Sequence, residues 1–367
     1  MEHILEEFYE LVQISSPTLH ERRMADALTE KLSELGFLVT EDDAGKKTGG
    51  DAGNVFARLA ATKGCTAEPV LLSAHMDRVP GDDGIEPLLD GDLIETDGST
   101  ILAADDVAGI CAILDGVRTI LSKDLPHPEI EILFTISEEV KLRGSRNFDF
   151  SKVHAKEAYC MDSSGRLGRI VTGAPKIEEL VFRVHGKRAH AGNEPEKGID
   201  ALRGAANILC DIREGRLDGE TTANWSVITA GNVTNVVCEL AEVHGEIRSH
   251  DDGKVAAYEE YCRRHIEDKT AGSGLWTEWE VRPNHGSFRV PEESGCVKRL
   301  KAAFDTCGFR YETEIGGGGM DANIINEQGI ECVGVAVGYV KNHTTEEMQY
   351  VKDLVKAGQL VAALLSL

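Results

Sequence analysis

The chain has 367 residues, of which 41% are hydrophobic and 28% are charged, and its formal net charge is -24 at pH 7. These proportions are typical of a globular protein with a large core, and the length favours two domains because single domains mostly span about 100 to 200 residues. Nucleic acid and anionic membranes are excluded as partners, since both are polyanions that such a negative chain would repel.

The nine cysteines are scattered and include no C-x-x-C pair, so neither a disulfide framework nor a zinc knuckle is indicated. Reduced thiols of this kind are typical of cytoplasmic proteins. The first residues are acidic with a helical pattern, unlike a signal peptide, and no apolar run reaches the roughly 20 residues of a membrane span. We therefore expect a soluble, cytoplasmic protein.

Apolar residues at helical spacing open the chain and predict helices over 2–14 and 20–36, which Pro17 separates and Gly36 ends. The segment 41–52 is polar and rich in Gly and Lys, which predicts a mobile loop. Strands are then predicted over 54–59, 69–74, 130–136 and 158–161, with a loop or hairpin over 81–98 and a helix directly after Asp106. Strands that alternate with helices predict a mixed, largely parallel α/β sheet flanked by helices.

The pattern changes from about residue 174 to the order strand, helix, strand, strand, helix, strand. That order resembles a compact α+β sandwich inserted as a unit. Its predicted strands cover 177–184, 225–229, 241–247 and 276–281, and its helices cover 199–212 and 255–266. Helices over 296–304, 322–326 and 351–365 and a strand over 332–337 then complete the first domain. We place that domain at 1–172 and 287–367, and the inserted domain at 173–286.

Acidic and imidazole side chains follow several predicted strands or precede predicted helices. They are His75 and Asp77, Asp105, Glu138 and Glu139, Asp162 and His343. Because functional groups gather at the carboxyl ends of the strands in such sheets, we expect them to meet there. Residues i and i+2 of a strand share a face, so Asp77 could accept a hydrogen bond from the second ring nitrogen of a metal-binding His75.

Charge counting favours two metal ions at this cluster. The carboxylates of Asp105, Glu139 and Asp162 carry three negative charges, and the imidazoles of His75 and His343 are neutral. Two zinc ions and one hydroxide balance these charges, whereas the carboxylates without cations would repel one another or take up protons. A water between cations about 3.5 to 4 Å apart is acidified to a pKa of roughly 7. Cobalt or manganese could occupy the same ligands. Glu138, outside the metal shell, would serve as general base.

The ordered motifs resemble the five signatures of the dizinc metallopeptidase family that contains peptidase T, carboxypeptidase G and the aminoacylases. They are His75-Met76-Asp77, Ala104-Asp105-Asp106, Ser137-Glu138-Glu139, Met161-Asp162 and His343. The resemblance covers essentially the whole chain and is strongest to peptidase T-like proteins. It implies a zinc-exopeptidase type of fold in which the insert serves as lid and dimerisation domain.

The resemblance also implies a role for each motif residue. One zinc would be held by His75, Asp105 and Asp162, and the other by Asp105, Glu139 and His343. Asp77 would orient His75, Glu138 would be the catalytic base, and the peptide bond between Asp105 and Asp106 would be cis.

In the insert, His190 resembles the family's lid histidine, which reaches the active site of a partner subunit, so we expect a homodimer. Asn235 and Arg248 resemble the pair that holds the terminal carboxylate of the substrate, and Gly319 lies in a glycine run that resembles the loop lining the substrate cleft. Arg78 departs from the family pattern, because many relatives have a small polar residue there.

Asp162 favours an aminopeptidase that acts on short peptides, since carboxypeptidases and deacylases of the family tend to have Glu at its position. A carboxypeptidase or N-acyl amino acid deacylase is the alternative within the family, and a catalytically inactive dimeric binding protein is the alternative outside it. Taken singly, His75 and His343 could be structural, Glu138 and Glu139 a solvated pair, and His190 a packing residue. Asn235 and Arg248 could equally be a turn residue and a surface ion-pair partner.

Overall fold

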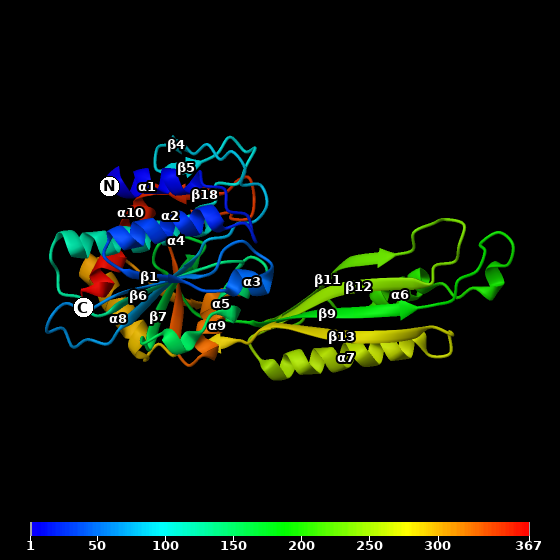
Figure 1. The fold of residues 1–367 in the computed structure, drawn as a ribbon. Helices are drawn as coiled ribbons and strands as arrows, with labels where there is room; N and C mark the ends of the chain where they lie inside the picture. The colour runs from blue at the N-terminus through cyan, green and yellow to red at the C-terminus, as the bar shows by residue number, and fades with distance from the viewer. Residues whose placement is uncertain (1, 367) are drawn as a thin grey trace. The chain divides into compact units, whose positions relative to one another are not determined.

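The structure is a computed structural model that describes residues 2–366. The chain forms two compact units, one made of the residues up to Ala174 together with those from Phe288 onward, and the other of Pro175–Ser287 (Figure 1). The predicted fold class, an α/β sheet protein with an inserted α+β unit, is confirmed. The assignment of catalysis to residues 1–172 and 287–367, and of lid and dimerisation roles to 173–286, stays a prediction.

The first unit is built on a mixed sheet that has nine strands in the described residues. In spatial order these are β1 (Leu38–Glu41), β2 (Val55–Leu59), β6 (Ile130–Thr135), β3 (Val70–His75), β7 (Glu157–Ser163), β16 (Glu331–Ala336), β8 (Arg169–Ala174) and β14 (Phe288–Arg289), with β15 (Glu312–Ile315) also beside β8. The four central strands, from β6 to β16, run parallel, whereas β2 and β8 join them antiparallel. Every residue of β3 and β6 is buried, as the apolar runs in the sequence predict.

Helices cover this sheet and contribute the rest of the core. They are α1 (Glu2–Val12), α2 (Arg22–Glu34), α4 (Ala104–Ser122), α5 (Arg143–Asn147), α8 (Gly295–Cys307), α9 (Asp321–Glu327) and α10 (Val351–Leu365). Helix α4 packs against β3 and β7 and also against α1 and α10, which is why it is apolar on nearly all sides. Gly116 allows α10 to come this close, because a Cβ atom there would lie 2.4 Å from Val361.

A small antiparallel sheet contacts α4 and α10 and positions the last candidate site residue. It contains β17 (Tyr339–Val340), β18 (Met348–Tyr350), β5 (Leu93–Glu95) and β4 (Leu88–Asp90). The loop between β17 and β18 carries His343, whose backbone is left-handed at φ +63°. Residues with such a backbone concentrate at functional sites, where the surrounding structure holds them in place.

The prediction of a mobile loop over 41–52 is wrong at its centre, where α3 (Ala44–Thr48) forms. The carboxylate of Asp42 accepts hydrogen bonds from the backbone N–H groups of Ala44 and Asn54, at 2.9 and 2.8 Å. This carboxylate fixes both ends of the segment, a local effect that the Gly and Lys composition conceals.

The second unit is a five-stranded antiparallel sheet with two helices packed on it. Its elements are β9 (Lys176–His185), α6 (Ala201–Asp211), β10 (Gly215–Arg216), β11 (Thr221–Ala230), β12 (Leu240–Ser249), α7 (Asp252–Thr270) and β13 (Trp276–His285). The sheet order is β10-β11-β12-β9-β13, and β10 pairs only with Thr222 and Ala223 of β11. The outer edge of β11 is therefore open beyond Ala223. None of the helices in residues 2–366 has the length and apolar character to cross a membrane.

Arg78, the departure from the family pattern, is 1% exposed and lies under the end of α1. Its guanidinium donates hydrogen bonds to the carbonyl oxygens of Leu11 and Val12, at 2.7 and 2.9 Å, and burial lowers its pKa to about 10. Arg78→Met would leave two buried carbonyls without donors, so we expect a loss of about 2 to 4 kcal/mol in the free energy of unfolding. Urea denaturation measures this loss, and the exposed Arg23→Met serves as control; equal midpoints for the two variants would contradict the assignment.

Candidate metal centre

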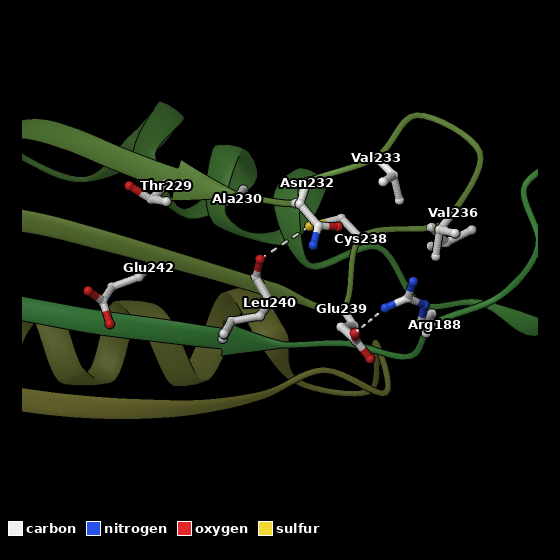
Figure 2. A pocket seen from close by; sticks show the side chains of 12 residues that line it. Arg188, Thr229, Ala230, Asn232, Val233, Val236, Cys238, Glu239, Leu240 and Glu242 are labelled. Atoms are coloured by element: carbon white, nitrogen blue, oxygen red, sulfur yellow. Dashed lines mark hydrogen bonds and ion pairs between the residues drawn. The ribbon is translucent and has the colours of Figure 1, made fainter.

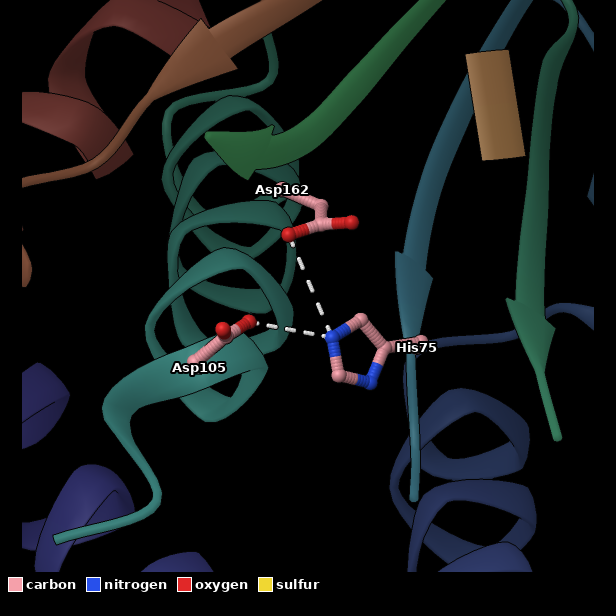
Figure 3. A group of neighbouring side chains, drawn as sticks. All are labelled: His75, Asp105 and Asp162. Atoms are coloured by element: carbon pink, nitrogen blue, oxygen red, sulfur yellow. Dashed lines mark hydrogen bonds and ion pairs between the residues drawn. The ribbon is translucent and has the colours of Figure 1, made fainter. Parts of the chain in front are cut away.

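The first half of the site lies at the carboxyl end of β3, where His75 ends the strand. The backbone N–H of His75 donates to Asp106 at 3.2 Å, and its Nδ1 lies 2.9 Å from the backbone carbonyl oxygen of Asp77. Its Nε2 faces Asp105 Oδ1 at 3.0 Å and Asp162 Oδ1 at 3.9 Å (Figure 3). One ligand atom from each of His75, Asp105 and Asp162 lies within 4.8 Å of the other two, close enough to surround one cation.

The second half of the site shares Asp105 with the first. Nε2 of His343 lies 3.2 Å from Asp105 Oδ2 and 3.1 Å from Glu139 Oε1. The two oxygens of Asp105 therefore face different imidazoles, Oδ1 toward His75 and Oδ2 toward His343. The carboxylate of Asp105 therefore belongs to both groups of candidate ligands.

The backbone around Asp105 has two unusual features. The peptide bond between Asp105 and Asp106 is cis, which confirms the prediction made from the family resemblance. Ala103 has a left-handed backbone at φ +59°. The carboxylate of Glu347 accepts hydrogen bonds from the N–H groups of Leu102, Ala103 and Asp105, at 3.1, 2.8 and 2.9 Å. Glu347 thus holds the segment that carries Asp105.

Asp77 is fully buried, and the hydrogen bonds of its carboxylate reach the turn after β6. Its carboxylate accepts hydrogen bonds from the backbone N–H groups of Glu138 and Glu139, at 2.8 and 3.3 Å, and from the hydroxyl of Thr18 at 2.8 Å. It lies 3.6 Å from Nδ1 of His75, farther than the Asp77 carbonyl oxygen. The carboxylate thus fixes the turn that carries Glu138 and Glu139, and its role in orienting His75 stays a prediction.

The cluster strongly favours positive charge at its centre. Burial is the largest single influence on the pKa of His75 and acts to lower it, but the hydrogen bonds to Asp105 and Asp77 and the nearby carboxylates Asp162 and Glu138 together raise this pKa well above its usual value. The pKa of His343 is raised to about 10 because its ring faces Asp105 and a second carboxylate. Burial raises the pKa of Asp162 to about 7 and places that of Glu138 well above its usual range.

These groups fit a pair of divalent cations. Imidazole nitrogens and carboxylate oxygens are donors that zinc, cobalt and manganese accept, and two sets of three such donors share Asp105. The electrostatic field that favours protons on the two imidazoles would favour metal ions at the same places. Among the described residues, a further group of Glu129, Glu131 and His154 is already occupied by Arg58, which lies 2.8 Å from Glu131.

Three supporting residues escaped the sequence analysis. Asn342 donates to Asp105 Oδ2 at 2.6 Å, and the buried Tyr339 donates its hydroxyl to Asp162 Oδ1 at 2.9 Å. Glu347, described above, is the third. All three belong to the short sheet and loop around His343, and their nearness to that residue in the sequence was the one available signal.

Glu347→Gln provides a sharp test of this support. The amide oxygen can replace one carboxylate oxygen, but the amide N–H₂ would then face the backbone N–H of Asp105, donor against donor. We expect about 10- to 100-fold weaker metal binding, which a competitive chelator titration measures. The matched control is Glu346→Gln, an exposed neighbour paired with Lys341 at 2.9 Å. Equal metal affinity of the two variants would show that Glu347 is dispensable.

The remaining predicted residues are distributed over both units. Gly319 lies half-buried in the first unit, between β15 and α9. His190 is exposed in the second unit, and its Nδ1 accepts hydrogen bonds from the backbone N–H groups of Gly192 and Asn193. The neighbouring Ala191 donates its N–H to the carbonyl oxygen of Asn235, so the His190 and Asn235 segments lie side by side.

Arg248 lies near the opposite end of β12 from this region and pairs with Glu246 at 2.7 Å. Eight residues separate it from Leu240, a strand length of roughly 26 Å. At its own end of β12, Leu240 lines a pocket of about 450 Å³ (Figure 2). The ion pair of Arg188 with Glu239 and the exposed Val233 also line this pocket. Within one subunit, Asn235 and Arg248 are thus at different ends of the sheet.

Comparison with known proteins identifies the family. Aminopeptidase PepT from Bacillus cereus has 36% sequence identity to this chain and a TM-score of 0.90, over 100% of this chain and 98% of that one. The chain belongs to the peptidase T family of metallopeptidases. A tripeptidase from Staphylococcus aureus has 32% identity and a TM-score of 0.93, over 100% and 97% of the two chains. Peptidase T from Shigella boydii is 26% identical over 77% of this chain and 70% of its own length.

Two family models match separate parts of this metallopeptidase. Residues 54–169 match the model described as peptidase family M28, and residues 176–273 match the peptidase dimerisation domain. The first range contains the four candidate site residues His75, Asp105, Glu139 and Asp162, and the second lies wholly within the second unit. The recognition of the family from its ordered motifs is confirmed.

Proposed function

We propose that this chain is a dimetal aminopeptidase that removes the N-terminal residue from short peptides, with tripeptides as the first substrates to test. The observation that carries the proposal is the shared carboxylate of Asp105, with His75 and Asp162 on one side and Glu139 and His343 on the other. The likeness to an aminopeptidase and a tripeptidase, each above 30% identity over nearly the whole chain, supports it.

Five residues would hold two divalent cations, with zinc as the proposed metal and cobalt or manganese as substitutes. They are His75, Asp105, Asp162, Glu139 and His343. Such a pair of cations supplies a water that is acidic near neutral pH and polarises the substrate carbonyl.

Glu138 would move the protons of the reaction. Its carboxylate would accept a proton from the attacking water as the new C–O bond forms, and would then give that proton to the amine nitrogen as the C–N bond breaks. Burial, together with the nearby Asp162, raises the pKa of Glu138, which favours the protonated form needed for the second step. The hydrogen bond from its N–H to Asp77 holds its backbone in place.

Substrate binding would involve His190, Asn235, Arg248 and Gly319. Since Asn235 and Arg248 lie at different ends of β12, they could hold one substrate carboxylate only if two copies of the chain each supplied one of them. The match to a peptidase dimerisation domain supports such a homodimer. The nine cysteines are all free thiols, which supports a reducing, cytoplasmic location.

The open edge of β11 gives the dimer proposal a test. Val227 and Ile228 are 51% and 44% exposed there, and an unpaired apolar edge strand readily pairs with another strand. We expect Val227→Asp/Ile228→Asp to be monomeric in light scattering and to lose most peptidase activity, because His190 and Asn235 would no longer reach a partner. Leu88→Asp, on the first unit, is the control. A fully active monomer would overturn the proposal.

The activity test compares a free tripeptide with its N-acetyl form on metal-loaded protein. An aminopeptidase cleaves the first and rejects the second, because the amine is part of what it recognises. Preference for the acetylated peptide would establish the family alternative, a deacylase or carboxypeptidase. Cleavage of neither, with two metals bound, would leave the inactive binding protein as the remaining interpretation.

A further inference from the structure

A second polar cavity lies in the first unit, apart from the metal ligands. It has a volume of about 350 Å³, within the usual range of small-molecule sites. Three cations, Arg166, Arg310 and Lys356, line it together with Asp353 and Phe309. We call this the basic cavity. The proposed aminopeptidase mechanism uses none of these residues.

Arg166 is held in place as a ready-made ligand group. Its Nε and Nη2 lie 2.5 and 3.2 Å from the carboxylate oxygens of Asp353, and its guanidinium stacks on the ring of Tyr350 at 3.8 Å. The backbone N–H of Leu167 also donates to Asp353, at 3.1 Å. The single acidic side chain of the cavity is thus committed, while Nη1 of Arg166 makes no hydrogen bond within the described part of the chain.

Arg310 and Lys356 leave the cavity with an excess of positive charge. Both side chains are exposed, and neither is paired with a carboxylate of residues 2–366. The ammonium of Lys356 lies 5.2 Å from the ring centre of Phe309. Three cations therefore face one paired carboxylate, in a chain whose formal net charge is -24. Such a local excess attracts small anions, whereas the charge of the whole chain repels large polyanions.

We propose that the basic cavity binds a small molecule through an oxyanion group, a phosphate or a carboxylate. The guanidinium fork of Arg310 matches the oxygen geometry of both groups, and Arg166, which Asp353 already holds in place, can offer Nη1 with little loss of freedom. Phe309 offers an apolar wall to the rest of the ligand. Because Arg166 follows Asp162 closely in the chain, and Gly165 between them donates its N–H to the carbonyl oxygen of Tyr339 at 2.7 Å, a bound anion would also brace this turn.

Inorganic phosphate and glutarate are the probes, each titrated into the metal-loaded protein at constant ionic strength. We expect saturable binding of at least one in calorimetry, with a matching rise in Tm. Arg310→Gln/Lys356→Gln should bind that anion roughly tenfold more weakly or worse, since two charge-assisted contacts are lost. Preference for phosphate or for glutarate tells which oxyanion the cavity suits.

The control is Arg23→Gln/Lys123→Gln, which changes net charge equally at two exposed positions outside the cavity. It should bind like the unmodified protein, and both double variants should keep their Tm without anion, because all four side chains are exposed. No saturable binding of either probe would overturn the proposal. So would equal binding by the cavity variant and the control, which would place the anion at the metal centre or on the surface at large. Neither result depends on peptidase activity.

Discussion

Glu138→Gln is expected to lower kcat on a tripeptide by about 10²- to 10⁴-fold while both metal ions stay bound. Gln has nearly the same shape, and its backbone N–H can still donate to Asp77 as Glu138 does at 2.8 Å. What it cannot do is accept the proton of the attacking water and return it to the leaving amine. Steady-state kinetics and elemental analysis on the same sample measure the two halves of this expectation.

The control for Glu138→Gln is Glu312→Gln, an exposed glutamate on β15. It should retain full activity and metal content. Loss of metal from the Glu138 variant would make this residue a ligand and not a base. Retention of both metals with near-normal kcat would remove Glu138 from the chemistry and require another proton acceptor in the cluster.

Asp105→Ala is expected to abolish tripeptide cleavage and to release both metal ions. Each of its oxygens faces one imidazole, His75 at 3.0 Å and His343 at 3.2 Å, so its removal takes a ligand from both halves at once. His343→Ala should behave differently, because it removes a ligand from one half. We expect it to keep about one metal ion per chain, held by His75, Asp105 and Asp162. Elemental analysis after dialysis against a weak chelator gives the stoichiometry.

The two variants differ in their risk to the fold. His343 is half-exposed, so its removal should disturb the fold little, whereas Asp105 lies in the buried cis Asp105–Asp106 segment and its removal could disturb the fold. Far-ultraviolet circular dichroism should therefore accompany both measurements. One metal ion retained by a folded Asp105→Ala variant would contradict the bridging role. Loss of both ions from His343→Ala would mean that the two halves bind metal only together.

The sequence predicts the central parts of this protein because they follow from local, periodic patterns. The run that becomes β3 is apolar throughout, as a strand buried on both faces must be, and it ends at His75. Residues near the carboxyl ends of parallel strands meet, so His75 and Asp162 could be brought together by reasoning on topology alone. The cis peptide, which the structure shows, and the proposed division of ligands between two metals both required the family resemblance, because neither spacing nor periodicity encodes them.

The contacts that support the site and the nearby segments could not be predicted from the sequence, for a physical reason. Glu347 acts through backbone N–H groups of Leu102, Ala103 and Asp105, and backbone groups leave no mark on the sequence. The helix α3 was missed for the same reason. Asp42 stabilises this segment by accepting hydrogen bonds from the backbone N–H groups of Ala44 and Asn54. Arg78 was noticed as a departure, but its hydrogen bonds to the end of α1 depend on long-range packing.

The insertion of the second unit affects the sheet of the first unit very little. The chain departs after Ala174 and returns at Phe288, and these two residues are direct antiparallel partners, as are Gly173 and Arg289. Two strands that pair in this way can be joined by a turn of a few residues. A chain in which residues 175–287 give way to such a hairpin would keep the strand order and all five proposed metal ligands. The second unit therefore occupies the place of a hairpin turn between β8 and β14, and its insertion requires no change in the order of the strands.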